Sequence, residues 1–92
     1  MSYIFNNQIS WQLICDKIFV FDESANTVNI FEDTAKEIWL YISKGLGSGD
    51  MITELSIKFG VQESQVKDDV LEFIGNLSSL NLISVGGGVL CN

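Results

Sequence analysis

The chain has 92 residues, of which 47% are hydrophobic and 11% aromatic, and its formal net charge at pH 7 is −7. A chain of this length forms one small domain with a single core, and its apolar content excludes an intrinsically disordered protein. Its 12 carboxylates outnumber its 5 lysines, and it has neither arginine nor histidine, so its surface repels nucleic-acid phosphates. Such a surface attracts a basic peptide or protein, or it serves only to keep the protein soluble.

The cysteines and the hydropathy of the chain bear on its cellular location. Cys15 and Cys91 lie near opposite ends of the chain and lack the spacing of metal ligands, so we expect two reduced, packed thiols rather than a disulfide. Residues 1–7 have neither the basic start nor the apolar run of a signal peptide, and no apolar stretch approaches the about 18 residues of a membrane span. These features predict a cytoplasmic protein that does not enter a membrane.

Strand patterns dominate the first third of the chain. Three segments are rich in β-branched and aromatic residues and are separated by short polar turns: 9–15, 17–21 and 27–31. In the third segment, Val28 and Ile30 would point to one face, while Asn29 and Phe31 would point to the other. We therefore expect an antiparallel meander with at least one open edge, a feature that proteins usually protect against unwanted pairing.

The next segment has the signals of a helix. Glu32 and Asp33 place negative charge where the helix would begin, and Asp33 is a plausible N-cap. Lys44 and Gly45 provide the cation and the glycine typical of a helix end. Four apolar residues recur at helical spacing between these signals: Ala35, Ile38, Trp39 and Ile42. Residues 45–49 are then expected to form a flexible connector, because no lysine and hydroxyl residue follow them as in a phosphate-binding loop.

Two further helices are predicted after this connector. Asp50 would cap a short helix that Gly60 ends, and its apolar residues share one face: Ile52, Leu55 and Phe59. The third helix has a continuous apolar stripe, consisting of Val66, Val70, Phe73, Leu77 and Leu80. Asn81 suits the left-handed position after this helix. Residues 82–85 and 89–91 would then form a hairpin wing or a loose tail.

The third helix has two flanks beside its apolar stripe. Leu71 and Ile74 widen the apolar surface, so that they either leave one wall of a groove or pack under the sheet or the wing. On the other flank, Asp69, Glu72 and Asn76 are simply solvated, or they orient a basic or amide group of a ligand.

Catalytic chemistry has little support in the sequence. Without histidine, serine and cysteine lack their usual base, and without arginine there is no common clamp for an oxyanion or a phosphate. The adjacent acidic pairs do not face one another on a helix or turn, and no calcium-loop spacing occurs. We therefore expect a protein that is not an enzyme and that has no metal site and no cofactor.

Together these elements predict a single α+β domain over residues 1–92. Its N-terminal three-stranded antiparallel sheet would be followed by three helices in a winged helix-turn-helix-like arrangement. An open sheet edge beside an apolar helix face, without catalytic residues, is most simply interpreted as a site that holds another peptide.

Two motifs stand in a fixed order along the chain. Residues 31–35 read Phe-Glu-Asp-Thr-Ala and are followed by Ile38-Trp39, and residues 69–77 read Asp-Val-Leu-Glu-Phe-Ile-Gly-Asn-Leu and are followed by Asn81-Leu82-Ile83. In order and spacing they resemble the PqqD family of small peptide chaperones, also called RiPP recognition elements, from about residue 9 to residue 83. The family pattern has Asn, Gly and Gly where this chain has Glu32, Ala35 and Asn81, and none of these positions touches the expected groove.

The resemblance implies a definite function. Domains of this family bind the N-terminal leader of a ribosomally made precursor peptide, which adds as a strand to the third strand of the sheet, beside the third helix. On this analogy the peptide-binding residues are Val28, Asn29, Ile30 and Phe31 on the strand, and Val66, Asp69, Val70, Glu72 and Phe73 on the helix. The strand supplies the hydrogen-bonding ladder, Val66, Val70 and Phe73 line the pocket, and Asp69 and Glu72 meet a polar or basic leader residue.

The resemblance also implies a second partner, a modifying enzyme or a leader peptidase to which the leader is delivered. We expect a freestanding domain, which is most similar to the small partner protein of lasso peptide assembly, and an escort for a radical SAM enzyme is the alternative. Two readings from other classes remain open. A winged helix-turn-helix regulator would need a basic recognition helix, but four of the five charges over residues 63–80 are acidic: Glu63, Lys67, Asp68, Asp69 and Glu72. An adaptor subunit would use the open edge for a protein rather than a peptide.

Overall fold

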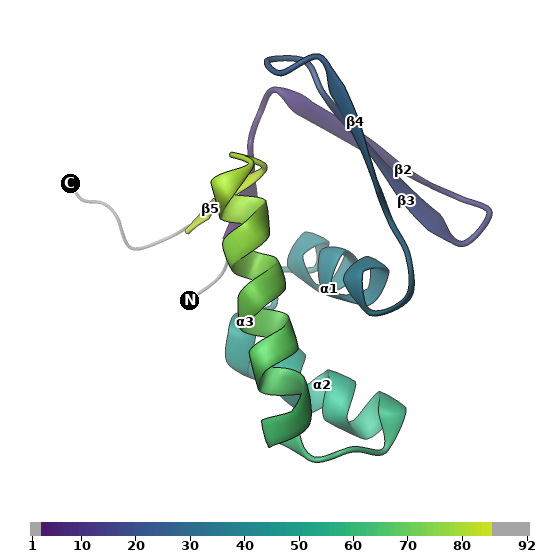
Figure 1. The fold of residues 1–92 in the computed structure, drawn as a ribbon, viewed down its shortest axis with the longest axis vertical. Coiled ribbons are helices and arrows are strands. Elements are labelled where there is room, and N and C mark those ends of the chain that lie inside the picture. The colour runs from purple at the N-terminus through teal and green to yellow at the C-terminus, as the bar shows by residue number, and fades with distance from the viewer. Residues whose placement is uncertain (1–2, 86–92) are drawn as a thin grey trace.

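A three-stranded antiparallel sheet lies over a group of three helices in the part of the chain that the computed structural model describes, residues 3–85 (Figure 1). The strands are β2 (Ile9–Ile14), β3 (Lys17–Asp22) and β4 (Thr27–Phe31), in the order β2-β3-β4. The predicted meander and the α+β class are therefore confirmed. The turn between β2 and β3 contains only Cys15 and Asp16, both with positive φ (52° and 65°), as a tight type I′ turn requires. Cys15 is consequently exposed at the tip of this hairpin and is not packed as predicted, while Cys91 lies outside the described residues.

A second, two-stranded sheet joins the two ends of the described chain. β1 (Tyr3–Phe5) pairs antiparallel with β5 (Ile83–Val85). Next to this pairing, the N–H of Asn6 donates to the carbonyl of Leu82 (2.9 Å), and the Asn6 side-chain amide donates to the carbonyl of Asn81 (2.8 Å). The structure does not show the expected winged helix-turn-helix-like arrangement, because the C-terminal strand pairs with the start of the chain. The other half of the expected hairpin, residues 89–91, lies outside the described residues.

The three helices are α1 (Asp33–Ser43), α2 (Ser48–Phe59) and α3 (Glu63–Ser79). The N-cap of α1 is Glu32 rather than Asp33, which is the first helical residue and has a φ of 57°. α2 starts two residues before Asp50, so part of the predicted glycine connector is helical and Asp50 lies in the first turn. The predicted helix ends are confirmed, since Gly60 and Asn81 adopt the left-handed conformation with φ values of 66° and 60°.

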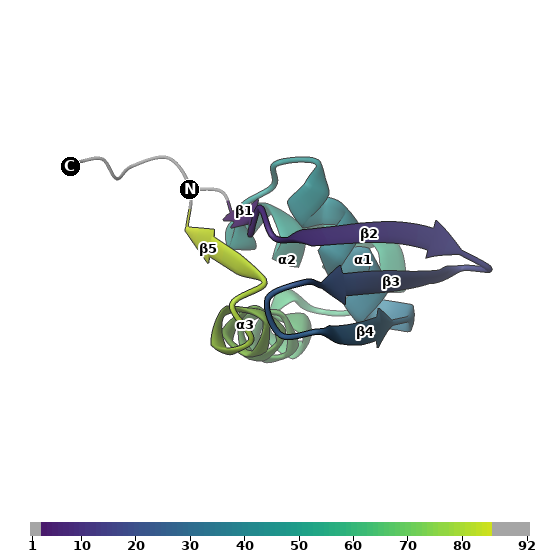
Figure 2. The ribbon, with the colours of Figure 1, turned by 90° about the horizontal axis from the view of Figure 1, so that it is seen from above.

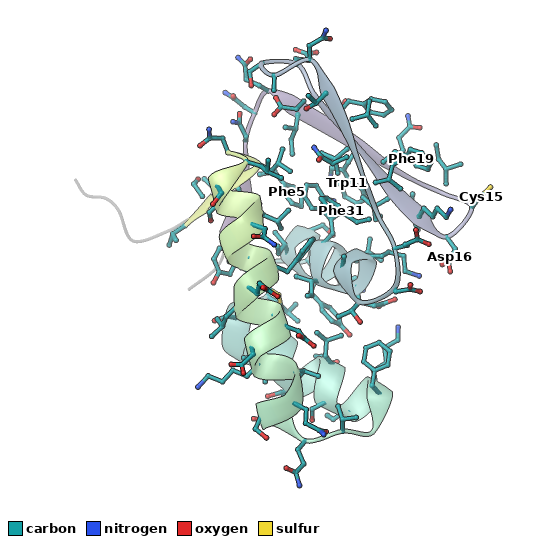
Figure 3. The ribbon with its side chains drawn as sticks, viewed as in Figure 1. Phe5, Trp11, Cys15, Asp16, Phe19 and Phe31 are labelled. Carbon is teal, nitrogen blue, oxygen red and sulfur yellow. The ribbon has the colours of Figure 1, made fainter. Side chains whose placement is uncertain are left out.

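The core lies between the sheet and the helices and is centred on Trp39 of α1, which is fully buried. Its indole stacks on Phe5 of β1 at a centroid distance of 4.4 Å and contacts Trp11 of β2 edge-on at 6.1 Å. Phe31, at the end of β4, lies 5.5 Å from the same indole. Figure 3 shows Phe5, Trp11 and Phe31 gathered between the sheet and α1. Residues far apart in the sequence therefore meet on one helix, which fixes the position of β4.

A chain of ion pairs also joins α1 to its neighbours. Lys36 contacts Asp16 at the β2–β3 turn (2.6 Å) and Glu37 on its own helix (3.4 Å), and Glu37 contacts Lys58 of α2 (2.8 Å). The hydrogen bond from Lys36 lowers the pKa of Asp16, and the hydrogen bond from Lys58 lowers the pKa of Glu37. The network links the β2–β3 hairpin and α2 through two adjacent residues of α1.

Candidate functional site

The sheet has two edges, β2 and β4, and the β4 edge lies beside α3. Figure 2 shows β4 as the strand of the sheet nearest to α3, with β2 on the opposite side. Within residues 3–85, β3 is the only strand that pairs with β4, so the other side of β4 is open. Which backbone groups of β4 point outward follows from the hydrogen-bonding register of the sheet.

That register can be read from both ends of the β2–β3 hairpin. In a two-residue hairpin the closing pair, here Ile14 and Lys17, is hydrogen-bonded. At the other end, the N–H of Glu23 donates to the carbonyl of Gln8 (3.1 Å), and these two residues also lie opposite each other. Hydrogen-bonded pairs alternate with non-hydrogen-bonded pairs, so the intervening residues of β3 direct their N–H and C=O groups toward β4: Ile18, Val20 and Asp22.

The partners of these β3 residues on β4 are Phe31, Asn29 and Thr27. Because those three use their backbone groups within the sheet, the N–H and C=O groups of Val28 and Ile30 point to the open edge. No turn, loop or cap in the described part of the chain uses these groups. β4 therefore presents unpaired donors and acceptors at alternate residues, which is the template for an added strand.

The side of α3 that faces β4 forms the other wall of a cleft. The ring of Phe73 meets the ring of Phe31 edge-on, at a centroid distance of 5.1 Å and an angle of 89°. Both rings line a mainly apolar pocket of about 390 Å³, together with Asn76, Leu77, Ser79 and Leu80. The two predicted residues Phe31 and Phe73 are thus brought together, one from each element.

Val66 and Val70, by contrast, are buried in the core and do not line this pocket. They lie on α3 together with buried Ile74 and Leu77, and these residues belong to the core that α3 shares with the sheet and the other helices. Leu71 is exposed, so of the two residues that widen the apolar surface only Ile74 packs inside. The helical stripe was correctly located, but the cleft uses its C-terminal part, at Phe73, Leu77 and Leu80, rather than Val66 and Val70.

The polar residues of α3 lie on the solvent side of the cleft wall. Asp69 and Glu72 are exposed, and neither belongs to an ion pair among residues 3–85. At 100° per residue, Asp69, Asn76 and Leu80 fall on one line along the helix, next to Phe73. Asn76, Ser79 and Leu80 line the pocket but were outside the predicted contact set. Asn76 and Leu80 follow Phe73 by three and seven residues, so helical spacing could have placed them on the same side of α3.

The outer face of the sheet is also apolar. Val28 and Ile30 point away from the helices and are 54% and 52% exposed. They lie opposite Phe21 and Phe19 of β3, so the four side chains form a continuous surface, which we call the outer patch. The outer patch is on the other side of β4 from the cleft.

Among residues 3–85, no three histidine, cysteine or acidic side chains are grouped so that they could hold a metal ion. The described helices include none with the length and apolar character that crossing a bilayer requires.

The fold and the cleft together define a small α+β domain with an open strand edge beside an apolar helix wall. The family model described as Coenzyme PQQ synthesis protein D (PqqD) matches residues 17–83. The chain belongs to the PqqD family, which confirms the resemblance seen in the two sequence motifs. No curated protein matches the chain.

Two solved structures have the same fold. One is described as TbiB1 in complex with the TbiA(beta) leader peptide, with a TM-score of 0.84 and 15% sequence identity over 95% of this chain and 99% of that one. The other is lasso peptide synthetase B1 complexed with the leader peptide, with a TM-score of 0.84 and 15% identity over 92% of this chain and 100% of that one. At this identity the likeness concerns the fold.

Proposed function

We propose that the protein binds the leader segment of a ribosomally synthesised precursor peptide by strand addition to β4. The observation that carries the proposal is the unpaired backbone of Val28 and Ile30 beside the Phe31–Phe73 pocket. Main-chain hydrogen bonds at an open edge supply affinity with little sequence dependence, while pockets for alternate side chains supply specificity. Both solved structures of the same fold were obtained with a leader peptide, which supports this class of ligand.

The register of the sheet also predicts how the leader's side chains are arranged. Leader residues that hydrogen-bond to Val28 and Ile30 direct their side chains outward, as Val28 and Ile30 do. The leader residues that alternate with them, opposite Asn29 and Phe31, direct their side chains into the cleft. The residue next to Phe31 enters the apolar pocket, so an apolar or aromatic side chain is favoured there, and the one next to Asn29 is free to be polar.

Asp69 and Glu72 extend the cleft wall on α3 with two carboxylates that have no partner in the described structure. In the proposal they attract a basic residue of the leader beyond the pocket. Val66 and Val70 act indirectly, because their packing fixes the position of α3 relative to β4. The proposed contact set is therefore the β4 segment with Phe73, Asn76, Leu80 and the two acidic residues.

The protein has no catalytic role in this proposal and delivers the leader to a modifying enzyme or leader peptidase. The outer patch stays uncovered when the cleft is filled, since the two lie on opposite sides of β4. It is apolar, and it would be continuous with the outward-facing side chains of the bound leader. We therefore assign the enzyme contact to the outer patch, with lasso peptide assembly favoured and a radical SAM enzyme as the alternative.

The test is fluorescence polarisation with a labelled leader from the precursor encoded beside this chain. Saturable binding is expected for the native protein. Val28→Pro removes one outward N–H from β4 and should weaken binding at least about tenfold, or about 1.4 kcal/mol. Leu13→Pro is the matched control, because it removes an outward N–H from the β2 edge, away from the cleft. Equal binding by native protein and a folded Val28→Pro variant would show that the leader does not use this edge.

A further inference from the structure

The β2 edge is open in the same sense as the β4 edge, and the proposed function does not use it. Since Ser10, Gln12 and Ile14 pair with β3, the backbone groups of Ile9, Trp11 and Leu13 point outward. Among residues 3–85, only the N–H of Ile9 is engaged, by the carbonyl of Asn6 in a turn (3.2 Å). Within the described part of the chain, Trp11 and Leu13 therefore each offer a free donor and a free acceptor, and Ile9 offers an acceptor.

This edge lacks the usual protection against pairing. The strand is six residues long with no bulge, contains no charged residue, and the chain has no proline at all. Its apolar residues are exposed near the hairpin tip, where Leu13 is 52% and Ile14 is 43% exposed. In a chain with a net charge of −7, two like-charged copies can meet along this neutral strand without carboxylates on the strands that face each other.

We propose that β2 pairs antiparallel with β2 of a second copy of this chain, about a two-fold axis at Trp11. In this register Trp11 faces Trp11, and Ile9 of each copy faces Leu13 of the other. Every outward backbone group on these residues then finds a partner, except the engaged N–H of Ile9 and the Leu13 carbonyl that faces it. The exposed Leu13 side chain is covered by Ile9, and on the outer face Ser10 meets Gln12. The result is a six-stranded sheet whose two margins are the β4 edges, so each dimer carries two open clefts.

Charge and edge pairing predict a specific dependence on salt. Each copy is strongly acidic, so long-range repulsion opposes association, and salt weakens that repulsion. Dimerisation through a neutral edge should therefore strengthen as ionic strength rises. A partner held by opposite charge would show the reverse.

Sedimentation velocity of the full chain over a concentration series, at about 0.05 M and about 0.5 M NaCl, tests the proposal. We expect a reversible shift to twice the chain mass, at lower concentration in high salt. Leu13→Lys should raise the dimer dissociation constant at least about tenfold. Ile57→Lys, which makes the same change of charge at a 71% exposed position on α2, should leave it unchanged. A monomer at every concentration, or equal dimerisation of the native protein and Leu13→Lys, would overturn the proposal.

A disulfide experiment tests the register directly. In the proposed dimer, positions 10 and 12 of opposite copies form a non-hydrogen-bonded pair, whose short Cα separation suits a disulfide. In chains with Cys15 and Cys91 replaced by Ser, a mixture of Ser10→Cys and Gln12→Cys should cross-link on mild oxidation. Gln12→Cys alone should not, because two copies of position 12 do not face each other. Cross-linking only in the single-variant sample would contradict the Trp11 register.

Discussion

Phe31 is the residue on which the core and the cleft meet. One side of its ring lies against Trp39, and the other meets Phe73 edge-on. A change in the cleft can therefore reach the buried indole through a single side chain. The position could be predicted from strand alternation, which placed Asn29 and Phe31 on the face opposite to Val28 and Ile30. The contact with Phe73 could not, because it depends on how α3 lies relative to the sheet.

Truncation of Phe73 separates binding from folding. Phe73→Ala removes one of the two rings that line the pocket, and since this side chain is only partly buried, the domain should remain folded. We expect leader affinity to fall at least about tenfold, or about 1.4 kcal/mol, in the polarisation assay. Leu71→Ala, an exposed apolar position on another flank of the same helix, is the control and should bind like the native protein. Equal losses from both variants would indicate a general effect on α3.

Asp22 stabilises the turn that leads into β4. Its carboxylate accepts hydrogen bonds from the Ser24 hydroxyl (2.7 Å) and from the N–H groups of Ser24 and Ala25 (3.1 and 3.3 Å). The Ser24 hydrogen bond holds the pKa of Asp22 below its usual value of 3.8. Since the folded state favours the carboxylate, this stabilisation is complete above the unfolded pKa and is lost as pH falls through the lower folded pKa.

Asp22→Asn should therefore lower the melting temperature at pH 7, where the native carboxylate is charged and accepts all three bonds. The difference from the native protein should narrow as the pH is lowered past 3.8, because the native side chain then loses its charge too. Thermal denaturation followed by circular dichroism at several pH values measures both effects. Glu23→Gln, an exposed neighbour with the same charge change, is the control. A difference that does not vary with pH would assign the effect to packing of the side chain.

At the scale of elements, the sequence predicted the structures that depend on local patterns but not the pairing of strands that are far apart in the chain. The meander and the helices have strong local signals, such as β-branched runs, left-handed residues at Gly60 and Asn81, and helical spacing. β1 and β5 are only three residues each, and their partners lie at opposite ends of the described chain. No local pattern identifies such a pairing, so the second sheet was missed. For the same reason the sequence located the apolar stripe of α3, but it did not distinguish the residues that are buried in the core from those that line the pocket.

β1 lies outside the segment that matches the family model, yet it supplies part of the core. Phe5 stacks on Trp39 and contacts Trp11, so Phe5→Ala would leave a void beside the buried indole. We expect a loss of about 3 kcal/mol in the free energy of unfolding, measured by urea denaturation. Ile4→Ala, on the exposed side of the same strand, should cost little. If Phe5→Ala were as stable as Ile4→Ala, the packing of Phe5 of β1 would not contribute to the stability of the core.

At the scale of the whole molecule, the distribution of charge distinguishes the two edges of the sheet. Neither edge strand carries a charge, but the β4 edge opens toward α3, where Asp69 and Glu72 are exposed and have no ion-pair partner within residues 3–85. The β2 edge lies on the side of the sheet away from α3 (Figure 2). A basic ligand is therefore drawn to β4, whereas β2 offers only neutral backbone pairing.

This difference predicts opposite responses to salt at the two edges. Binding of a basic leader to the cleft should weaken as NaCl is raised, because salt screens its attraction to a protein of charge −7, while pairing through β2 should strengthen. Polarisation titrations at several salt concentrations give the slope of the logarithm of the dissociation constant. The double substitution Asp69→Asn with Glu72→Gln should flatten that slope, whereas Asp50→Asn with Glu54→Gln, the same charge change on α2, should flatten it less. If both pairs act equally, the leader responds only to net charge, and the two carboxylates of α3 have no particular place in its recognition.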